Sequence, residues 1–211
     1  MRSIIVSDIH AKTSTAELVN KIANEHDADN ILILGDVTNF GPVQDAVDYI
    51  TSLNRPVYAI PGNCDPREFP SAVSKVATDL HGRSVIIGGV KISGLGGSNP
   101  TIFDTPFEIS EEEIFSSLDA ICDGVDILMV HAPAFGTLDK IPNGMMVGST
   151  SILDIVKKYR PKVVLSGHIH EERGMKEIGG TLFLNPGAAK EGYAALLTVN
   201  DGKAAAELLM L

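Results

Sequence analysis

Five short apolar runs place the strongest constraint on the fold of this 211-residue chain. Each run has four or five residues and is rich in Ile, Val and Leu; the runs span residues 3–7, 31–34, 57–60, 127–130 and 163–166. This length and composition is typical of strands that are buried on both faces between layers of helices. The sequence therefore predicts a sheet whose strands alternate with helices.

Segments with helical character lie between these runs. Residues 14–26 begin with Ser14 and have Glu17 three residues later, which predicts a capping box in front of an apolar stripe. Three more helices are expected over residues 43–50, 110–121 and 149–159. The last of them must end before Pro161, because a proline disfavours helical geometry at the residue that precedes it.

After residue 80 the apolar runs come in closely spaced pairs. Hairpins are predicted for residues 85–87 with 90–93, 175–178 with 181–184, and 194–199 with 204–209. Strand–helix units followed by hairpins imply an α/β (α+β) fold with a mixed sheet, or two stacked sheets, covered by helices. Two stretches rich in Gly and Pro, residues 94–106 and 132–148, are expected to form the rims of an active site.

Composition limits the class of protein. With 44% hydrophobic residues and no long polar tract, residues 1–211 are expected to form one domain around a buried core. A net charge of −10 argues against extended nucleic-acid binding, which needs clustered Lys and Arg. We see neither a leader-like apolar segment nor an apolar run of about 18 residues, and we expect no membrane association. Cys64 and Cys122 are expected to be free thiols in a cytoplasmic protein.

Polar residues follow five of the predicted strands directly. These residues are Asp8 and His10; Asp36; Asn63, Cys64 and Asp65; His131; and His168 and His170. Each cluster alone is typical of an ordinary turn, but four of the six histidines fall in these clusters, while His26 and His81 look structural. Because ligands collect at the carboxyl ends of parallel strands, we expect the clusters to converge. Glycines 35, 62 and 167 would let the backbone approach a ligand closely.

Together these motifs resemble the calcineurin-like metallophosphoesterase superfamily, and most closely its small stand-alone bacterial and archaeal phosphodiesterases, which share the segment Asn185-Pro186-Gly187. The resemblance covers residues 8–170 and implies a four-layer αββα sandwich of two stacked mixed sheets flanked by helices. It implies a first metal held by Asp8, His10 and His170, and a second held by Asn63, His131 and His168. Asp36 would bridge the two ions.

The ligand types agree with that implication. Imidazole and carboxylate groups suit two divalent transition-metal ions, with Mn, Fe, Zn, Ni and Co as candidates. A hydroxide held by the pair would attack phosphorus in line, so that no Ser or Cys nucleophile is needed. We therefore predict a metal-dependent phosphoric ester hydrolase acting on a small or nucleotide-like ester. The residues expected to be catalytic are Asp36, Asn63, His131, Cys64 and Asp65.

Two positions depart from the family pattern. Members commonly have His where this chain has Cys64, and a thiol is a poorer proton donor, so phosphodiesters or activated esters are predicted to be preferred over alkyl monoesters. A merely packed Cys64 and a turn carboxylate at Asp65 remain alternatives. The arginine that follows Gly35-Asp36 in protein phosphatases is missing, which disfavours a phosphoprotein phosphatase. Asn39, Cys64 and Arg67 are the candidate substrate-binding residues.

Two other functions stay open at this point. A non-catalytic scaffold is one, because a retromer subunit of this fold has lost ligands and binds proteins instead. A nuclease that acts on nucleic-acid ends is the other, although the acidic charge weakens it. A homo-oligomer is a reasonable expectation. Apolar side chains in the rim loops could line a pocket or pack against a partner subunit; they are Phe103, Phe107, Phe135, Met145 and Met146.

Overall fold

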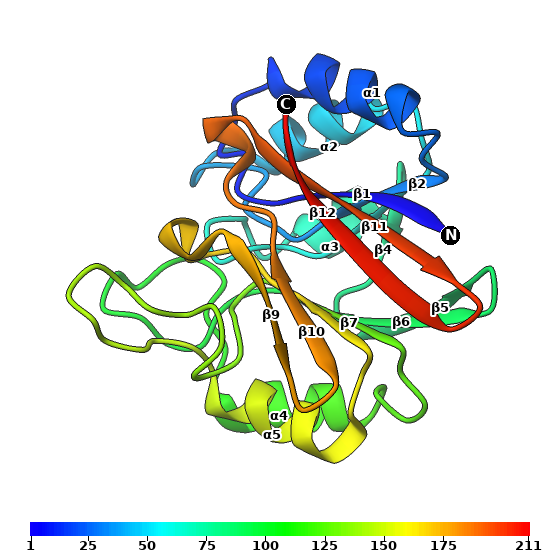
Figure 1. Cartoon of the computed structure of the whole chain (residues 1–211). Helices are drawn as coiled ribbons and strands as arrows, with labels where there is room; N and C mark the ends of the chain where they lie inside the picture. The colour runs from blue at the N-terminus through cyan, green and yellow to red at the C-terminus, as the bar shows by residue number, and fades with distance from the viewer.

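Two six-stranded sheets stack face to face in the computed structural model, which describes residues 1–211 (Figure 1). The first sheet has the strand order β12 (Lys203–Met210), β11 (Tyr193–Asn200), β1 (Arg2–Val6), β2 (Asn30–Ile33), β3 (Val57–Ala59) and β4 (Thr78–Asp79). The second has the order β5 (Arg83–Ile87), β6 (Val90–Leu95), β7 (Ile127–Val130), β8 (Val163–Leu165), β10 (Thr181–Asn185) and β9 (Gly174–Ile178). Both sheets mix parallel and antiparallel pairs.

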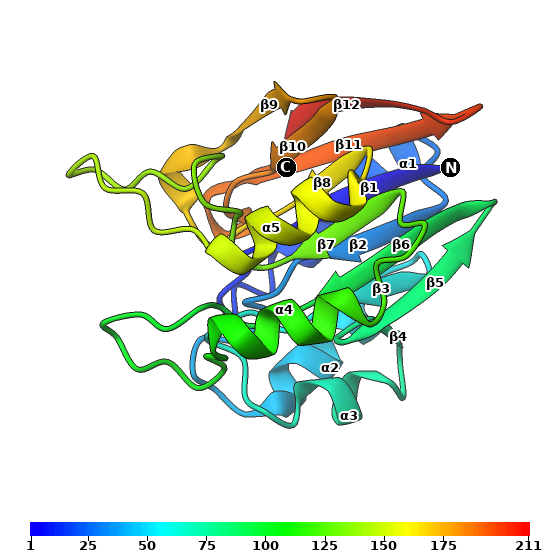
Figure 2. The ribbon, with the colours of Figure 1, turned by 90° about the horizontal axis from the view of Figure 1, so that it is seen from below.

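Helices cover the outer face of each sheet. They are α1 (Thr15–Glu25), α2 (Val43–Thr51), α3 (Phe69–Val73), α4 (Glu111–Asp119) and α5 (Thr150–Tyr159), with short 3-10 turns η1 (His170–Glu172) and η2 (Ala189–Glu191). Figure 2 shows α4 and α5 side by side over the second sheet. With 11 residues in its longest helix, the fold has no helix of the length and apolarity that a membrane span requires.

Three separate hydrophobic clusters fill the spaces between the layers. One cluster joins α1, α2 and α3 to the first sheet, with Phe69 fully buried in it. A second joins α4 and α5 to the second sheet, and the third, which contains Ile5 and Leu165, lies between the two sheets. Three apolar interfaces require four layers, so the predicted αββα sandwich is confirmed.

Most of the predicted elements are present, but one helix and one strand were missed, besides the two short 3-10 turns. The five apolar runs became β1, β2, β3, β7 and β8, and the three hairpins are also present. Helix α3 and strand β4 were not predicted, because they have only five and two residues and so show no periodicity.

The helix starts test the capping predictions. The Ser110 and Ser149 hydroxyls accept the backbone N–H of Glu113 and Ile152, each at 3.1 Å, so two helices begin where expected. The capping box at Ser14 is wrong. Ser14 is already in the helical region and makes no cap hydrogen bond, because the chain enters α1 through a preceding turn in which the Thr15 hydroxyl donates to the Lys12 carbonyl.

Strand direction brings the polar clusters to one edge of the sandwich. Strands β1, β2 and β3 are parallel in the first sheet, and β6, β7 and β8 are parallel in the second. The loops after β1, β2, β3, β7 and β8 carry all of the predicted metal ligands. The carboxyl ends of both sheets therefore supply one site, as the sequence predicted.

Candidate metal centre

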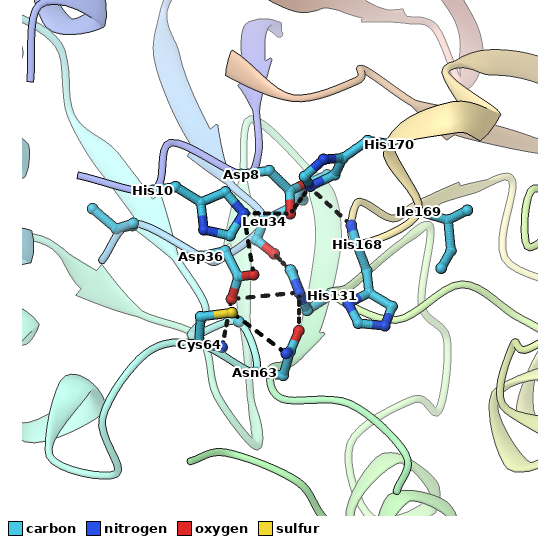
Figure 3. Close-up of polar contacts among 12 residues, drawn as sticks. Asp8, His10, Leu34, Asp36, Asn63, Cys64, His131, His168, Ile169 and His170 are labelled. Carbon is cyan, nitrogen blue, oxygen red and sulfur yellow. Dashed lines mark hydrogen bonds and ion pairs between the residues drawn. The ribbon is translucent and has the colours of Figure 1, made fainter. Parts of the chain in front are cut away.

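Backbone hydrogen bonds lock the loops of the site together. The Asp8 N–H donates to the Gly35 carbonyl at 3.0 Å, and the His10 N–H donates to the Asp36 carbonyl at 2.9 Å. In the second sheet, the Gly167 N–H donates to the His131 carbonyl at 3.0 Å. The side chains of these loops point toward one another in Figure 3.

The first group of potential ligands contains Asp8, His10 and His170. Their ligand atoms all lie within 4.8 Å of one another. The Asp8 Oδ1 atom is 3.2 Å from His170 Nε2 and 3.8 Å from His10 Nε2. These three residues are the set that the sequence assigned to one metal ion.

Asp36 lies between this group and a second one. Its Oδ2 atom is 3.7 Å from His10 Nε2, and its Oδ1 atom is 3.6 Å from His131 Nε2. Asp8, Asp36 and His131 also form a group within 4.8 Å, and all three side chains are buried. One carboxylate oxygen thus faces each side of the centre, which is the geometry of a bridging ligand.

His131 contacts a backbone carbonyl and the Asn63 side chain. Its Nδ1 is 2.8 Å from the Leu34 carbonyl, which can only accept, so Nδ1 carries a proton. Its Nε2 is 2.9 Å from Asn63 Oδ1 and 3.6 Å from Asp36 Oδ1. The contact with Leu34 therefore leaves Nε2 as the ring atom that faces the centre.

His168 is oriented differently from the other predicted ligands. Its ring packs edge-on against the His131 ring with the centroids 5.1 Å apart, and it belongs to none of the close ligand groups. Its backbone N–H donates to Asp8 Oδ2 at 3.1 Å. Burial, followed by the charge on His131, lowers the pKa of His168 to about 4. The imidazole is therefore neutral, as a metal ligand must be.

The backbone of the site is strained. Four predicted ligands have positive φ angles: Asp8 at 56°, His10 at 46°, Asp36 at 51° and His168 at 68°. Such conformations cost on the order of 1–3 kcal/mol each, and they persist where the surrounding structure imposes them. The surrounding structure therefore holds these loops in conformations that they would not adopt on their own.

Glycines allow the loops to approach one another. A Cβ atom at position 62 would lie 2.0 Å from Asp36 Oδ1, and one at position 167 would lie 1.9 Å from Ser7 Oγ. Only hydrogen fits at either position. The close backbone approach that was predicted at Gly62 and Gly167 is therefore an approach to a neighbouring loop of the protein.

The donor set fits a pair of divalent cations. Asp8 Oδ1 is buried and makes no hydrogen bond, with His170 Nε2 at 3.2 Å as its ion-pair contact, and His10 Nδ1 is buried without a hydrogen-bond partner. Burial would raise the pKa of Asp8, but contact with His170 and the charges of His131 and His170 hold it below its usual range. The same contact with Asp8 raises the pKa of His170. The centre thus contains carboxylate charge that attracts a cation.

Asp65 joins two loops of the centre. It is fully buried, and its Oδ1 accepts the N–H of Thr38 at 2.8 Å. Its Oδ2 accepts the N–H groups of Gly62 at 2.8 Å and Val37 at 3.3 Å. These are the contacts of a positioning residue and fit the alternative of a turn carboxylate, while a catalytic role for Asp65 stays a prediction. Burial and the nearby Asp36 carboxylate raise its pKa.

Cys64 lies at the centre with 7% of its surface exposed. Its backbone N–H donates to Asp36 Oδ1 at 2.8 Å, and its sulfur lies 3.5 Å from Asn63 Nδ2. Burial and the Asp36 charge raise the pKa of the thiol. Cys122, by contrast, is buried in the hydrophobic cluster between the second sheet and its helices.

The other two predicted substrate contacts have different surroundings. Asn39 is exposed on the loop after β2 and makes no hydrogen bond within the protein, so its side chain is free to bind a ligand. The Arg67 guanidinium donates to the carbonyls of Pro106 and Glu108 and stacks 4.6 Å from the Phe107 ring centroid. Substrate binding by Arg67 stays a prediction.

Several groups orient the ligands, and among them sequence reasoning singled out only Asn185. The Leu34 carbonyl fixes the His131 ring, and Glu191 Oε1 lies 3.8 Å from His170 Nδ1. The Asn185 amide donates to the Ile169 carbonyl at 2.8 Å and so supports the loop that carries His168 and His170. Of these groups, only the Asn-Pro-Gly motif left a signal in the sequence.

The predicted rim loops project beyond the metal centre. Phe103 is 78% exposed and Met145 is 58% exposed, whereas Phe107 is buried beneath Arg67. The two loops are joined where the Asn99 amide donates to the Val147 carbonyl at 3.3 Å. A separate hollow of about 570 Å³ lies between α5 and the β9–β10 hairpin and contains none of the predicted ligands.

Comparisons with known proteins agree with this geometry. A family model for calcineurin-like phosphoesterases matches residues 1–172. An uncharacterized protein of Methanocaldococcus jannaschii is 31% identical over 195 residues, which cover 88% of each chain. A solved structure from Thermus thermophilus has a TM-score of 0.76 at 18% identity, covering 98% of this chain and 97% of that one. A structure described as a novel archaeal phosphodiesterase has a TM-score of 0.59 at 18% identity, covering 99% and 100%.

Proposed function

We propose that this chain, which belongs to the calcineurin-like phosphoesterase family, hydrolyses a small or nucleotide-like phosphodiester with the help of two divalent metal ions. The family resemblance inferred from the motifs is confirmed, and metal-dependent phosphoester hydrolysis is the activity of the family. The number of ions, their identity and the preference for diesters belong to the proposal.

One observation carries the two-metal proposal. Asp36 directs Oδ2 toward His10 and Oδ1 toward His131. A single carboxylate therefore lies between the two groups of proposed ligands, with one oxygen facing each group. We assign Asp8, His10 and His170 to the first ion. We assign Asn63, His131 and His168 to the second, with a small reorientation of the His168 ring.

The protein groups prepare the site for an anionic ester. When bound, two divalent ions would supply Lewis acidity and activate the water that attacks phosphorus. The two carboxylates, Asp8 and Asp36, neutralise only part of the charge of two such ions, so the site stays positive and attracts phosphate. The Leu34 carbonyl holds His131 in the tautomer that leaves Nε2 free for binding.

The preference for diesters follows from Cys64. A monoester with an alkyl leaving group needs a proton at the departing oxygen, and a strong positioned acid supplies it. Burial and the Asp36 charge raise the pKa of the Cys64 thiol, so it is a weak acid. Activated esters and phosphodiesters with good leaving groups depend less on this proton. The exposed Phe103 and Met145 on the rim loops could contact the base of a nucleotide-like substrate.

The bridging role of Asp36 is tested by substitution with alanine. We expect Asp36→Ala to lose hydrolysis and to bind fewer than two equivalents of Mn²⁺ or Co²⁺ in calorimetric titration. Asp79→Ala, which changes a buried carboxylate at the end of β4 away from the centre, is the control and should keep both properties. If Asp36→Ala keeps two bound ions and wild-type turnover, the proposed centre is wrong.

Substrate preference is tested with two chromogenic esters. Metal-stripped enzyme is supplied in turn with Mn²⁺, Ni²⁺, Co²⁺, Mg²⁺ or Zn²⁺, and the rates on bis-p-nitrophenyl phosphate and p-nitrophenyl phosphate are compared. We expect the diester to be cleaved faster and Cys64→His to gain monoester activity, while Cys122→Ser behaves as wild type. Faster cleavage of the monoester by wild-type enzyme would contradict the Cys64 argument. Binding of two ions without turnover of either ester would favour a scaffold.

A further inference from the structure

We infer that the sulfur of Cys64 is an additional ligand of the metal ion that His10 and Asp36 contact. This inference rests on the proposed metal centre and adds an eighth ligand to the seven assigned above. It gives Cys64 a role that neither a proton donor nor a packed side chain would have.

The geometry supports coordination by one ion. The ligand atoms of His10, Asp36 and Cys64 all lie within 4.8 Å of one another. Nitrogen, oxygen and sulfur ligands lie roughly 2.0–2.3 Å from a zinc ion, so two ligands at a tetrahedral angle are about 3.5 Å apart. The three side chains are therefore close enough to be drawn together onto one ion. Figure 3 shows the sulfur beside the Asp36 carboxylate and the Asn63 amide.

The backbone holds the sulfur in this place. The Cys64 N–H is bonded to Asp36 Oδ1 at 2.8 Å, and the Cys64 carbonyl accepts the Thr38 hydroxyl and the Phe40 N–H, each at 3.3 Å. The sulfur accepts a weak hydrogen bond from Asn63 Nδ2 at 3.5 Å and lies beside the Asp36 carboxylate. The main chain of Cys64 is therefore fixed, while its sulfur is held only weakly. A metal ligand that is preorganised needs both properties.

Packing does not account for Cys64. Although 93% of its surface is buried, it belongs to none of the three hydrophobic clusters. Cys122, which is fully buried, belongs to the cluster under α4 and α5. A second observation points to a cation beside this group: Asp8 Oδ1 is buried and makes no hydrogen bond, and it faces His10 Nε2 at 3.8 Å and His170 Nε2 at 3.2 Å.

A thiolate ligand would change the choice of metal. Coordination breaks the S–H bond, forms a sulfur–metal bond and releases the proton to solvent. Thiolate favours softer ions such as Zn²⁺ and Co²⁺ over Mn²⁺ and Mg²⁺, which prefer oxygen. Cys64 would therefore bias a site that is otherwise built from imidazole, carboxylate and amide groups toward zinc or cobalt.

Cobalt titration of the metal-stripped protein tests the inference. Bound Co²⁺ gives a sulfur-to-cobalt charge-transfer absorption in the near ultraviolet only when a thiolate is a ligand. We expect this band in wild type and in Cys122→Ser, and no band in Cys64→Ser. Cys64→Ser should also bind Zn²⁺ at least roughly tenfold more weakly, because removal of a group that only hydrogen-bonds to a metal ligand already costs about 10–100-fold in affinity. The affinity for Mn²⁺ should be nearly unchanged.

The outcomes separate this inference from the proposed function. If two Co²⁺ ions bind to wild type without the band, or if Cys64→Ser keeps the band, the thiolate ligand is refuted and the di-metal centre stands. If wild type binds no Co²⁺ and no Zn²⁺, the proposed centre and the thiolate ligand both fail. Circular dichroism of Cys64→Ser verifies that the variant is folded.

Discussion

Replacing Asp65 with asparagine should weaken both the fold and the metal centre. The carboxylate uses both oxygens: Oδ1 accepts from Thr38, and Oδ2 accepts from Gly62 and Val37. An amide has one oxygen, so in either orientation its NH₂ group faces at least one buried N–H. Each unsatisfied buried donor costs about 1–3 kcal/mol, and relief of the repulsion from Asp36 offsets part of this.

The net loss should be about 1–3 kcal/mol, and Tm should fall by roughly 2–4 °C for each kcal/mol in a chain of this size. Metal affinity should fall by about 10–100-fold, because the two loops that Asp65 joins carry the ligands Asp36 and Asn63. Urea unfolding of the metal-free protein measures the first effect. Calorimetric titration with Co²⁺ measures the second.

Asp139→Asn is the matched control. Asp139 is also buried in a loop, but only its Oδ2 is used, accepting the N–H groups of Gly136 and Gly148 at 3.0 Å each. An amide oxygen can replace Oδ2, so this variant should lose little stability and no metal affinity. Wild-type cobalt affinity in Asp65→Asn, or an equal loss in Asp139→Asn, would refute the reasoning.

Three further variants test other parts of the structure. The pKa of His168 is lowered from 6.5 to about 4, so its contribution to the stability of the metal-free protein is present above pH 6.5 and is lost, by up to about 3 kcal/mol, as the pH falls to 4. His168→Gln should flatten this dependence in urea unfolding, and an unchanged slope would count against the shift. Gly167→Ala places a Cβ 2.7 Å from Asp8 Oδ2, and overpacking of this kind costs about 1–3 kcal/mol of stability, so Tm and Co²⁺ affinity should both fall. A variant with wild-type Tm would show that the loop can move aside. Arg67→Ala should lose about 1–2 kcal/mol from its hydrogen bonds and its contact with Phe107 while KM stays near wild type, whereas a large rise in KM at unchanged Tm would favour substrate binding.

Local pattern was sufficient where an element could be recognised from its own residues. The buried strands β1, β2, β3, β7 and β8 are short apolar runs, and the serine caps of α4 and α5 act within one turn. Local pattern failed at Ser14, where the chain before α1 takes a turn that the capping box does not describe. It also failed for α3 and β4, which are too short to show periodicity.

The sandwich depends on pairings between distant segments. Strand β11 lies antiparallel beside β1, with Ile4 opposite Leu196, and β10 joins β8 in parallel, with Phe183 opposite Val164. The residues of one strand in such a pair do not indicate which other strand it will pair with. These pairings complete the two sheets, and apolar burial across three interfaces selects them.

The sequence by itself predicted the identity and the order of the proposed metal ligands, because each one follows a strand whose direction sends it to the same edge of a sheet. Only the tertiary structure decided how those groups face one another. It set the two orientations of the Asp36 oxygens, the hydrogen bond from His131 to the Leu34 carbonyl, the loop contacts of Asp65 and the place of the Cys64 sulfur. The physical reason is that these contacts join loops from separate strands and both sheets, and their distances exist only after the layers have packed.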